Sequence, residues 1–309
     1  MSGLLTLFRK ELADHFGSKR FIILLALVWL SGLSAIYVAA QSIRQAVAGS
    51  EFVFLKLFVT SSEGLPPFVA FIAFFGPLIG LSLGFDAINR EQSSGTLGMV
   101  LSQPILRDSV INGKFLAGIS TIGFMLVSIV LIVSGLGLWM LAVPPSLEEV
   151  LRIIAYTAIT IIYIGFWMAL VMLFSIFFKR ITTSALAGMA VWLFFLFFMS
   201  MIAGVAADRL APIEEESVET ILRHEQVRSA IMRVSPNTLY SEAIATIMEP
   251  TTRLLGQGAL MMPVPDLGPL PLSQSLIIVW PHIVTIIGLT LICFAVSYVK
   301  FMRQEIRAP

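Results

Sequence analysis

The distribution of charged residues constrains this chain more than any other feature of its sequence. Six stretches of at least 22 residues contain no Asp, Glu, Lys or Arg: residues 21–43, 64–85, 115–147, 153–178, 181–207 and 267–299. About 20 apolar residues in a helix cross the roughly 30 Å hydrocarbon core of a bilayer. Because the apolar runs are continuous and not alternating, they predict helices and not a β-barrel. We expect transmembrane helices near 21–40, 67–86, 115–141, 153–178, 183–206 and 276–299.

The composition excludes a soluble globular enzyme. Hydrophobic residues make up 57% of the chain and charged residues 13%, whereas soluble domains are about 45–50% apolar and about 25% charged. A net charge of +1 gives no bulk signal for nucleic acid, so we expect no nucleic-acid partner. The single cysteine, Cys293, excludes an internal disulfide and a Cys-based zinc site. The predicted fold is therefore an all-α, polytopic integral membrane protein, embedded in the lipid bilayer as one domain over residues 1–309.

The positions of Lys and Arg predict the orientation in the membrane. With the N-terminus inside, twelve of the twenty basic residues fall in the short inner segments. Most of the remaining eight lie in one long outer loop, and long loops count little in the positive-inside rule. We therefore expect both termini to be cytoplasmic. Lys179 and Arg180 fill a very short turn, which predicts a tight inner hairpin between the fourth and fifth spans.

Residues 1–20 predict an amphipathic helix at the cytoplasmic interface. One face carries Leu5, Phe8, Leu12 and Phe16, and the other carries Arg9, Lys10, Asp14 and Lys19. Such a helix could simply lie in the interface, or it could also touch a cytoplasmic partner. Composition does not separate these two alternatives.

The inner segment 86–114 is short and unusually polar. Gly95 predicts a break, residues 97–101 suit one short helix, and Pro104 would stop that helix. A short helix between two spans could act as a lever that moves both spans together. From the residues alone, an ordinary connecting loop is the favoured interpretation.

The outer segment 207–275 is the largest predicted polar portion. It starts with an acidic cluster at 214–219, shows helical periodicity over 221–234, and continues with Ser235-Pro236, which is typical of a helix N-terminus. Residues 250–271 contain five prolines and predict an irregular return to the membrane. An alternative function follows from this segment: a membrane scaffold or sensor that binds a partner through 207–275.

Catalytic motifs are absent or incomplete. No Gly-x-x-x-x-Gly-Lys-Ser/Thr segment exists, because Phe115 follows Gly113-Lys114. The spans also lack the interior ionisable residues that mark proton-coupled transporters. An intramembrane hydrolase built on Ser120, Glu148 and His282 is a third hypothesis, and the spacing around these residues does not support it. We expect no cofactor and no metal on this chain.

Two further patterns lie within the spans. Gly76, Gly80 and Gly84 recur every four residues in the second span, which permits close helix packing. That packing could lie within one subunit or at a mobile interface. The fifth span is crowded with aromatic residues over 192–198, which could face lipid or line a path for an apolar substrate.

The loop sequence resembles a known family. Residues 85–97 (Phe-Asp-Ala-Ile-Asn-Arg-Glu-Gln-Ser-Ser-Gly-Thr-Leu), 101–105 (Leu-Ser-Gln-Pro-Ile) and 112–115 (Asn-Gly-Lys-Phe) together resemble the first cytoplasmic loop of ABC transporter permeases of the type-two exporter class. Residues 8–12 and 234–236 are similar to that family as well. The most similar branch is that of multicopper-enzyme-maturation-like permeases.

The resemblance implies a division of labour. Two permease copies, as a homodimer or with a related permease, would pair with two copies of a cytoplasmic ABC ATPase in the cell (inner) membrane of a prokaryote. ATP and Mg would bind the ATPase and nothing would bind this chain as a cofactor. The residues implied to contact the ATPase are Phe8, Glu11, Arg90, Glu91, Gly95, Thr96, Leu97, Met99 and Leu101. The residues implied to line the path are Phe71, Phe74, Phe75, Trp192, Phe194 and Phe198.

Overall fold

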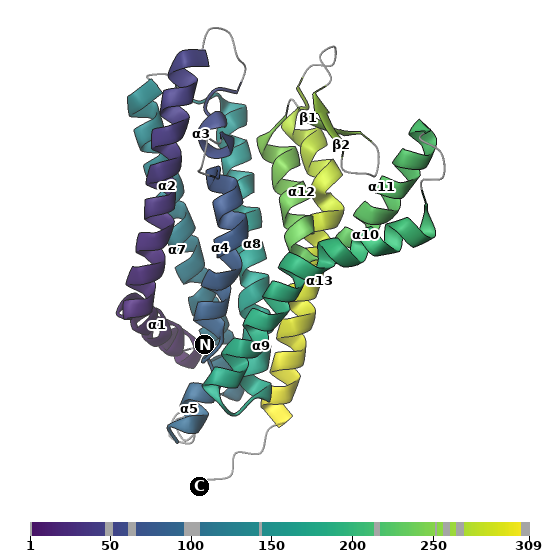
Figure 1. Ribbon diagram of the computed structural model, residues 1–309. Coiled ribbons are helices and arrows are strands. Elements are labelled where there is room, and N and C mark those ends of the chain that lie inside the picture. Colours follow the sequence, from purple (N-terminus) through teal and green to yellow (C-terminus); the bar gives the residue numbers. More distant parts are fainter. Residues whose placement is uncertain are drawn as a thin grey trace.

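The computed structural model describes residues 2–46, 52–60, 66–95, 106–141, 144–212, 217–250, 252–255, 260–263 and 269–303. Six helical stretches are long and apolar enough to cross a membrane: Lys19–Tyr37, Phe68–Ser93, Arg107–Met140, Leu147–Phe177, Ile181–Leu210 and Leu272–Arg303. They form an elongated bundle (Figure 1). The six expected spans and the all-α membrane fold are therefore confirmed.

The helices are α1 (Ser2–Phe16), α2 (Lys19–Ala46), α3 (Lys56–Val59), α4 (Phe68–Gly84), α5 (Asn89–Ser93), α7 (Arg107–Leu141), α8 (Leu147–Phe177), α9 (Ile181–Leu193), α10 (Met199–Leu210), α11 (Val218–Met232), α12 (Pro236–Met248) and α13 (Leu272–Arg303). A π-helix, η1 (Phe194–Phe198), joins α9 to α10. Strands β1 (Thr252–Leu255) and β2 (Leu260–Pro263) pair antiparallel, with Thr252 opposite Pro263. Part of the expected irregular return at 250–271 is thus an ordered hairpin.

The fourth span, α8, is the central helix of the bundle. In its most hydrophobic window 72% of the residues are buried, against 17% for the fifth span and 11% for α13. Its aromatic side chains Tyr156, Tyr163 and Trp167 are fully buried. A membrane helix that is apolar on all sides can be covered by protein all round, and α8 takes that position.

The second span, α4, packs on α8 through its glycines. A Cβ atom added at Gly80 would lie 2.5 Å from the backbone oxygen of Ile164, and one at Gly84 would lie 2.6 Å from the backbone oxygen of Met168. The glycine repeat therefore serves packing within the subunit, one of the two alternatives that the sequence left open. Small residues let two backbones approach this closely in a membrane.

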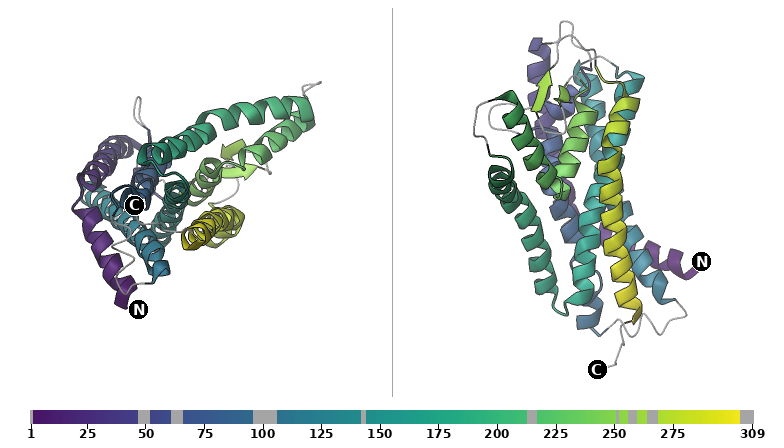
Figure 2. Two further views of the ribbon diagram at one scale, coloured as in Figure 1. Left: turned by 90° about the horizontal axis from the view of Figure 1, so that it is seen from below. Right: turned by 90° about the vertical axis from the view of Figure 1, so that its right-hand side faces the viewer.

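Segment 207–275 begins in the last turn of α10, at the end of the fifth span, and contains α11, α12 and the β1–β2 hairpin. Helices α10 and α11 lie side by side and extend sideways, away from the bundle axis (Figures 1 and 2). Helix α12 packs against α8, α13 and α4. It begins with Pro236 after Ser235, whose backbone is extended (φ −79°, ψ 126°), which confirms the expected helix start. We call α10 and α11 the arm.

The two ends of the bundle differ in content. Helices α1 and α5 and the last turn of α13 lie at one end, and the β1–β2 hairpin lies at the other (Figure 1). We call them the α5 end and the hairpin end. The α5 end corresponds to the side that the positive-inside rule assigns to the cytoplasm.

Candidate coupling site and apolar cavity

One buried lysine joins three helices at the α5 end. The Lys114 side chain on α7 is only 8% exposed, and its Nζ donates to Glu11 Oε1 of α1 at 3.0 Å and to Glu91 Oε1 of α5 at 2.8 Å. A charge this buried is strongly stabilised by its partners and costly to leave alone. We call these three residues the Lys114 triad. It couples α1 and α5 to the start of the third span.

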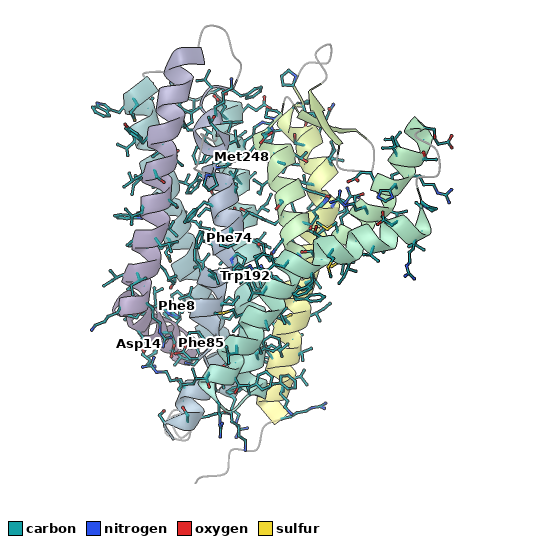
Figure 3. All side chains as sticks on the ribbon, in the orientation of Figure 1. Phe8, Asp14, Phe74, Phe85, Trp192 and Met248 are labelled. Atoms are coloured by element: carbon teal, nitrogen blue, oxygen red, sulfur yellow. The ribbon has the colours of Figure 1, made fainter. Side chains whose placement is uncertain are left out.

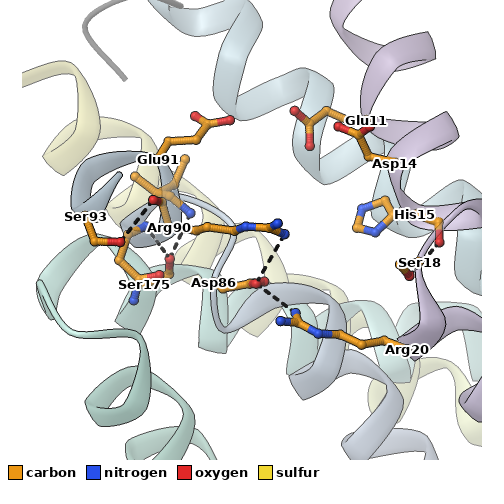
Figure 4. Close-up of polar contacts among 12 residues, drawn as sticks. Glu11, Asp14, His15, Ser18, Arg20, Asp86, Arg90, Glu91, Ser93 and Ser175 are labelled. Carbon is orange, nitrogen blue, oxygen red and sulfur yellow. Dashed lines mark hydrogen bonds and ion pairs between the residues drawn. The ribbon is translucent and has the colours of Figure 1, made fainter. Parts of the chain in front are cut away.

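A second ion pair fixes the start of the 86–114 segment. Arg20 of α2 donates from Nη1 to Asp86 Oδ2 at 2.7 Å, and Arg90 approaches the same oxygen at 3.9 Å (Figure 4). The Arg20 guanidinium also lies 4.8 Å above the ring of Phe85. These exposed arginines contribute less than the buried lysine, because water screens them.

Backbone groups of the same segment are held by α8. The amides of Ile88 and Asn89 donate to the Ser175 hydroxyl at 2.9 and 3.1 Å, and the Asn89 side chain donates to the Phe178 carbonyl at 3.4 Å. Asn89 is fully buried. The described start of the expected coupling loop 86–114 is therefore attached to α2, α7 and α8 at once, as a lever requires.

The structure places some of the expected coupling residues and not others. Glu11 and Glu91 meet at Lys114, whereas Arg90 is exposed beside Asp86. Phe8 is half-buried in α1 (Figure 3). Gly95 follows α5 with a φ of +71°, a conformation that favours glycine, so the expected break is present. Thr96, Leu97, Met99 and Leu101, with the expected helix at 97–101, lie outside the described residues.

Helix α1 packs on α7 through Leu7, which was not part of the expected apolar face. Leu7 is 5% exposed and packs on Gly113 of α7, whereas Leu5 of the apolar face is 50% exposed. The resemblance treated Glu11 only as a contact for the ATPase, but Glu11 turns toward α7 and pairs with Lys114. Helix α1 is thus held by packing and an ion pair within the chain.

The charge state of Glu11 gives a pH dependence. Burial alone would raise the pKa of this carboxyl, but Lys114 and Lys10 outweigh burial and hold the pKa below its ordinary 4.5. A lowered folded pKa contributes stability above the unfolded value, and this stability is lost as pH falls through the folded pKa. We expect the melting-temperature difference between wild type and Glu11→Gln to be full above about pH 4.5 and to vanish in more acidic buffer.

Asp14→Asn is the matched control for this pH series. Asp14 lies on the same helix and pairs with Lys10 at 3.2 Å, but its side chain is largely exposed. We expect a small shift of melting temperature for Asp14→Asn at every pH. An equal pH dependence in both variants would contradict the role assigned to the Lys114 triad.

The aromatic residues expected to line a path separate into two groups. Phe74 of α4 meets Trp192 of α9 edge-to-face at 5.4 Å, and Phe75 contacts Phe74 at 4.9 Å and stacks on Phe71 at 4.2 Å. The contact between Phe74 and Trp192 brings the second and fifth spans together. Phe194 and Phe198 stack on each other at 6.1 Å within η1 but are 43% and 51% exposed. Those two face outward from this chain.

A cavity lies beside this aromatic contact. It has a volume of about 360 Å³ and is bounded by α4, α12 and η1. Phe74 is the one expected path residue that lines it, whereas Tyr240, Ile244 and Met248 of α12 come from a segment that the sequence assigned to an outer loop. Helix α12 is short and its apolar residues alternate with polar ones. Its hydropathy therefore did not mark it as part of the bundle interior.

A buried arginine braces the hairpin end. Arg152 is fully buried, and its guanidinium donates to the carbonyls of Ile247 (2.7 Å) and Leu270, to the hydroxyl of Ser275 (3.4 Å) and to Glu148 (2.8 Å). Glu149 caps its own helix through Ser146 and accepts the Phe54 amide at 2.8 Å. The Glu-Glu-x-x-Arg pattern therefore has a structural explanation in this chain.

A third charged cluster lies at the base of α12. Glu242 Oε2 is 2.8 Å from Arg233 Nε and 2.8 Å from His282 Nε2, so the carboxylate joins α12 to the end of α11 and to α13. The Nε2 atom of His282 contacts Glu242, whereas its Nδ1 atom is buried and has no hydrogen-bond partner among the described residues. Among the described residues, no group of three or more His, Cys, Asp and Glu side chains could hold a metal ion.

The sequence matches a known protein family over nearly its whole length. Residues 5–306 match the family described as ABC-2 family transporter protein. The chain belongs to the ABC-2 transporter family. A match over nearly the whole chain supports a membrane permease subunit of an ABC transporter, in agreement with the six helices that are long and apolar enough to cross a membrane.

A relative supports the same class. The permease is 32% identical over 111 residues to a probable ABC transporter permease protein, NosY, of Pseudomonas aeruginosa. The match covers 36% of this chain and 37% of that protein. A similarity of this extent supports the permease class, and it carries no substrate from one protein to the other.

Proposed function

We propose that this chain is the membrane-spanning subunit of an ATP-driven exporter in the inner membrane of a prokaryote. A separate cytoplasmic ABC ATPase would hydrolyse ATP with Mg, and two permease copies would pair with two ATPase copies. Family membership supports the permease class. The single observation that carries the ATP-driven step is the Lys114 triad, because it connects the α5 segment directly to a transmembrane helix.

The triad suggests how force would enter the membrane. ATP binding would close the ATPase pair and displace α5 and the residues after Gly95. Since Glu91 and Glu11 share Lys114 Nζ, a displaced α5 moves α7 and α1 with it. The bonds from Ile88 and Asn89 to Ser175 pass the same displacement to α8. Switching between two packed states then opens the cavity to one side or the other.

The experiment compares two lysines that hold the same carboxylate. Lys10 and Lys114 each lie 3.0 Å from Glu11 Oε1, but only Lys114 also contacts Glu91. We expect Lys114→Met to reduce substrate-stimulated ATPase activity of the reconstituted complex to its basal level. Lys10→Met should leave stimulation within about twofold of wild type, because an exposed ion pair is worth little.

Two further results separate coupling from folding. Both variants should co-purify with the ATPase subunit and be inserted at wild-type levels. Leu97→Asp, in the segment that resembles the family loop, should lose the ATPase subunit altogether. Full stimulation in Lys114→Met would exclude the triad as the coupling element, and a chain that never captures an ATPase would exclude the exporter.

The outer segment 207–275 supports one alternative, a membrane scaffold. Helix α11 projects from the bundle and exposes Ile221 and Leu222. A scaffold would bind an extracytoplasmic partner through segment 207–275 and would not need an ATPase. Ile221→Asp and Leu222→Asp together would then abolish function while Lys114→Met would leave it intact, which is the reverse of the result expected for an exporter.

A further inference from the structure

We propose that Pro77 makes α4 a hinge and that Tyr163 of α8 is the positioning residue that sets this hinge. The Tyr163 hydroxyl donates its single proton either to Ala73 of α4 or to Asn237 of α12. The hinge is a property of this chain and is measured without the ATPase. Its role rests on the proposed function, because α4 leads to the α5 segment that the ATPase would displace. A failure of the hinge and a failure of the exporter are therefore separate results.

A proline inside the second span leaves one backbone carbonyl of α4 without its helical donor. In an α-helix the N–H of each residue donates to the carbonyl four residues earlier, and proline has no N–H. Pro77 is buried within α4, so the carbonyl of Ala73 lacks this bond. An unbonded carbonyl is costly where no water reaches it, and helices bend at such positions. The Ala73 carbonyl therefore depends on a donor from a neighbouring helix.

Tyr163 supplies that donor from the central helix of the bundle. Its hydroxyl oxygen lies 3.1 Å from the carbonyl oxygen of Ala73, and its side chain is fully buried. The ring lies close to the hinge, since a Cβ atom added at Gly76 would be 3.6 Å from Cε1 of Tyr163. The ring also stacks on Tyr240 of α12, with 4.0 Å between centroids and 8° between planes. Packing thus keeps the hydroxyl beside the hinge.

Asn237 competes for the same proton. Its Oδ1 atom lies 2.7 Å from the Tyr163 hydroxyl, which is shorter than the 3.1 Å to Ala73. A tyrosine hydroxyl carries one hydrogen and can donate it to only one of these two oxygens at a time. The shorter distance favours Asn237 in this structure, so the hinge is weakly held. When α12 carries Asn237 away, the hydroxyl turns to Ala73 and the hinge stiffens.

The place of Asn237 in the chain connects the hinge to the arm. Asn237 lies in the first turn of α12, and only residues 233–235 separate α12 from α11. Helix α4 in turn leads to α5 at the α5 end of the bundle (Figure 1). A displacement of the arm would therefore change the stiffness of α4, and with it the movement of the coupling segment, without direct contact between the arm and the ATPase.

Hydrogen exchange of the purified chain in detergent micelles, followed by mass spectrometry of α4 peptides that span Pro77, tests the proposal. Asn237→Leu keeps the approximate size of the side chain and removes the competing oxygen. We expect it to slow exchange of the amides after Pro77 by about fivefold, the factor that one hydrogen bond contributes on average. Adding Tyr163→Phe should abolish this slowing. An unchanged rate in Asn237→Leu, or slowing that survives Tyr163→Phe, would overturn the proposal.

Tyr240→Phe is the matched control for Tyr163→Phe. The two rings belong to one stack, and each variant loses one hydroxyl group. The Tyr240 hydroxyl pairs with Thr160 at 2.9 Å and takes no part in the choice between Ala73 and Asn237. Tyr240→Phe added to Asn237→Leu should therefore leave the slow exchange of α4 in place. Equal effects of the two tyrosine variants would contradict the role of the hydroxyl beside Ala73.

Pro77→Ala removes the hinge itself. Alanine has an N–H, so the Ala73 carbonyl regains its helical bond and no longer needs Tyr163. Exchange in α4 should be slow in this variant, and adding Asn237→Leu should slow it no further. If Asn237→Leu fails to fold, Tyr163→Phe still decides the result. It should speed exchange after Pro77 in the wild-type background and have no effect in Pro77→Ala, and an equal effect in both backgrounds would overturn the proposal.

The complex with the ATPase tests the role of the hinge in transport. Exchange of the amides after Pro77 should differ between the nucleotide-free complex and the complex trapped with ATP and vanadate, and this difference should disappear in Pro77→Ala. A hinge that behaves as expected in the chain alone, in a complex that does not respond to nucleotide, would keep the hinge and reject its role in transport.

Discussion

Replacing Arg152 with leucine is expected to produce the largest loss of stability in this permease. The substitution leaves the carbonyls of Ile247 and Leu270 without the guanidinium that now bonds them, inside a fully buried region. Removing one partner from such a buried charged network typically costs about 3–5 kcal/mol. The consequence should be local to the hairpin end, where α8, α12 and the chain before α13 meet at this side chain.

Unfolding in detergent, followed by tryptophan fluorescence, measures this effect. Arg209→Leu is the matched control, because Arg209 is exposed in the last turn of α10. Its substitution should change the free energy of unfolding by less than about 0.5 kcal/mol. Equal stability of Arg152→Leu and wild type would mean that α12 and α13 are held at the hairpin end by packing alone.

The second large effect is expected from adding one methyl group at Gly80. A Cβ at this position would meet backbone atoms of α8, the Ile164 oxygen at 2.5 Å and the Met168 nitrogen at 2.9 Å, and neither can turn aside as a side chain would. Helices α4 and α8 must then separate. We expect Gly80→Ala to cost about 1–3 kcal/mol, as overpacking of a well-packed core does.

Gly135→Ala is the same chemical change, and we expect it to raise the stability and not to lower it. Apart from its own stretch of helix, no atom of the described residues lies within 4 Å of a Cβ at Gly135, although this residue is also helical. Alanine there should stabilise the protein by about 0.5–1 kcal/mol, because glycine in a helix loses more entropy on folding. If both variants lose the same stability, close packing of α4 on α8 is not the reason for the glycine repeat.

The spans could be predicted from the sequence because membrane insertion depends on the length and hydrophobicity of a continuous stretch of residues. Uninterrupted runs without charge, such as 153–178, mark a helix whatever its neighbours are. The helix start at Ser235-Pro236 and the break at Gly95 were equally accessible, since both depend on local backbone geometry. These features need no knowledge of tertiary contacts.

The interior of the site could not be predicted in the same way. Glu11 and Lys114 are separated by 103 residues, and Arg152 and Leu270 by 118. The sequence marked Glu11 for a partner protein and Lys114 only as the basic residue of a Gly-Lys pair, so their contact was missed. A short helix such as α12 carries too little hydropathy to be recognised as part of the bundle, and therefore the cavity wall that it forms was missed too.

The π-helix at Phe194–Phe198 gives the arm a particular evolutionary freedom. A π turn holds one residue more than the α-helical turn it replaces, and each residue of an α-helix advances the chain by about 100° around the axis. Deleting a single residue there would restore a regular α-helix and rotate α10 and α11 about the helix axis, so that they project from the bundle in a different direction. Lineages of this permease could thus redirect the arm toward a different neighbour by a change of one codon, while the six spans and the Lys114 triad keep their positions.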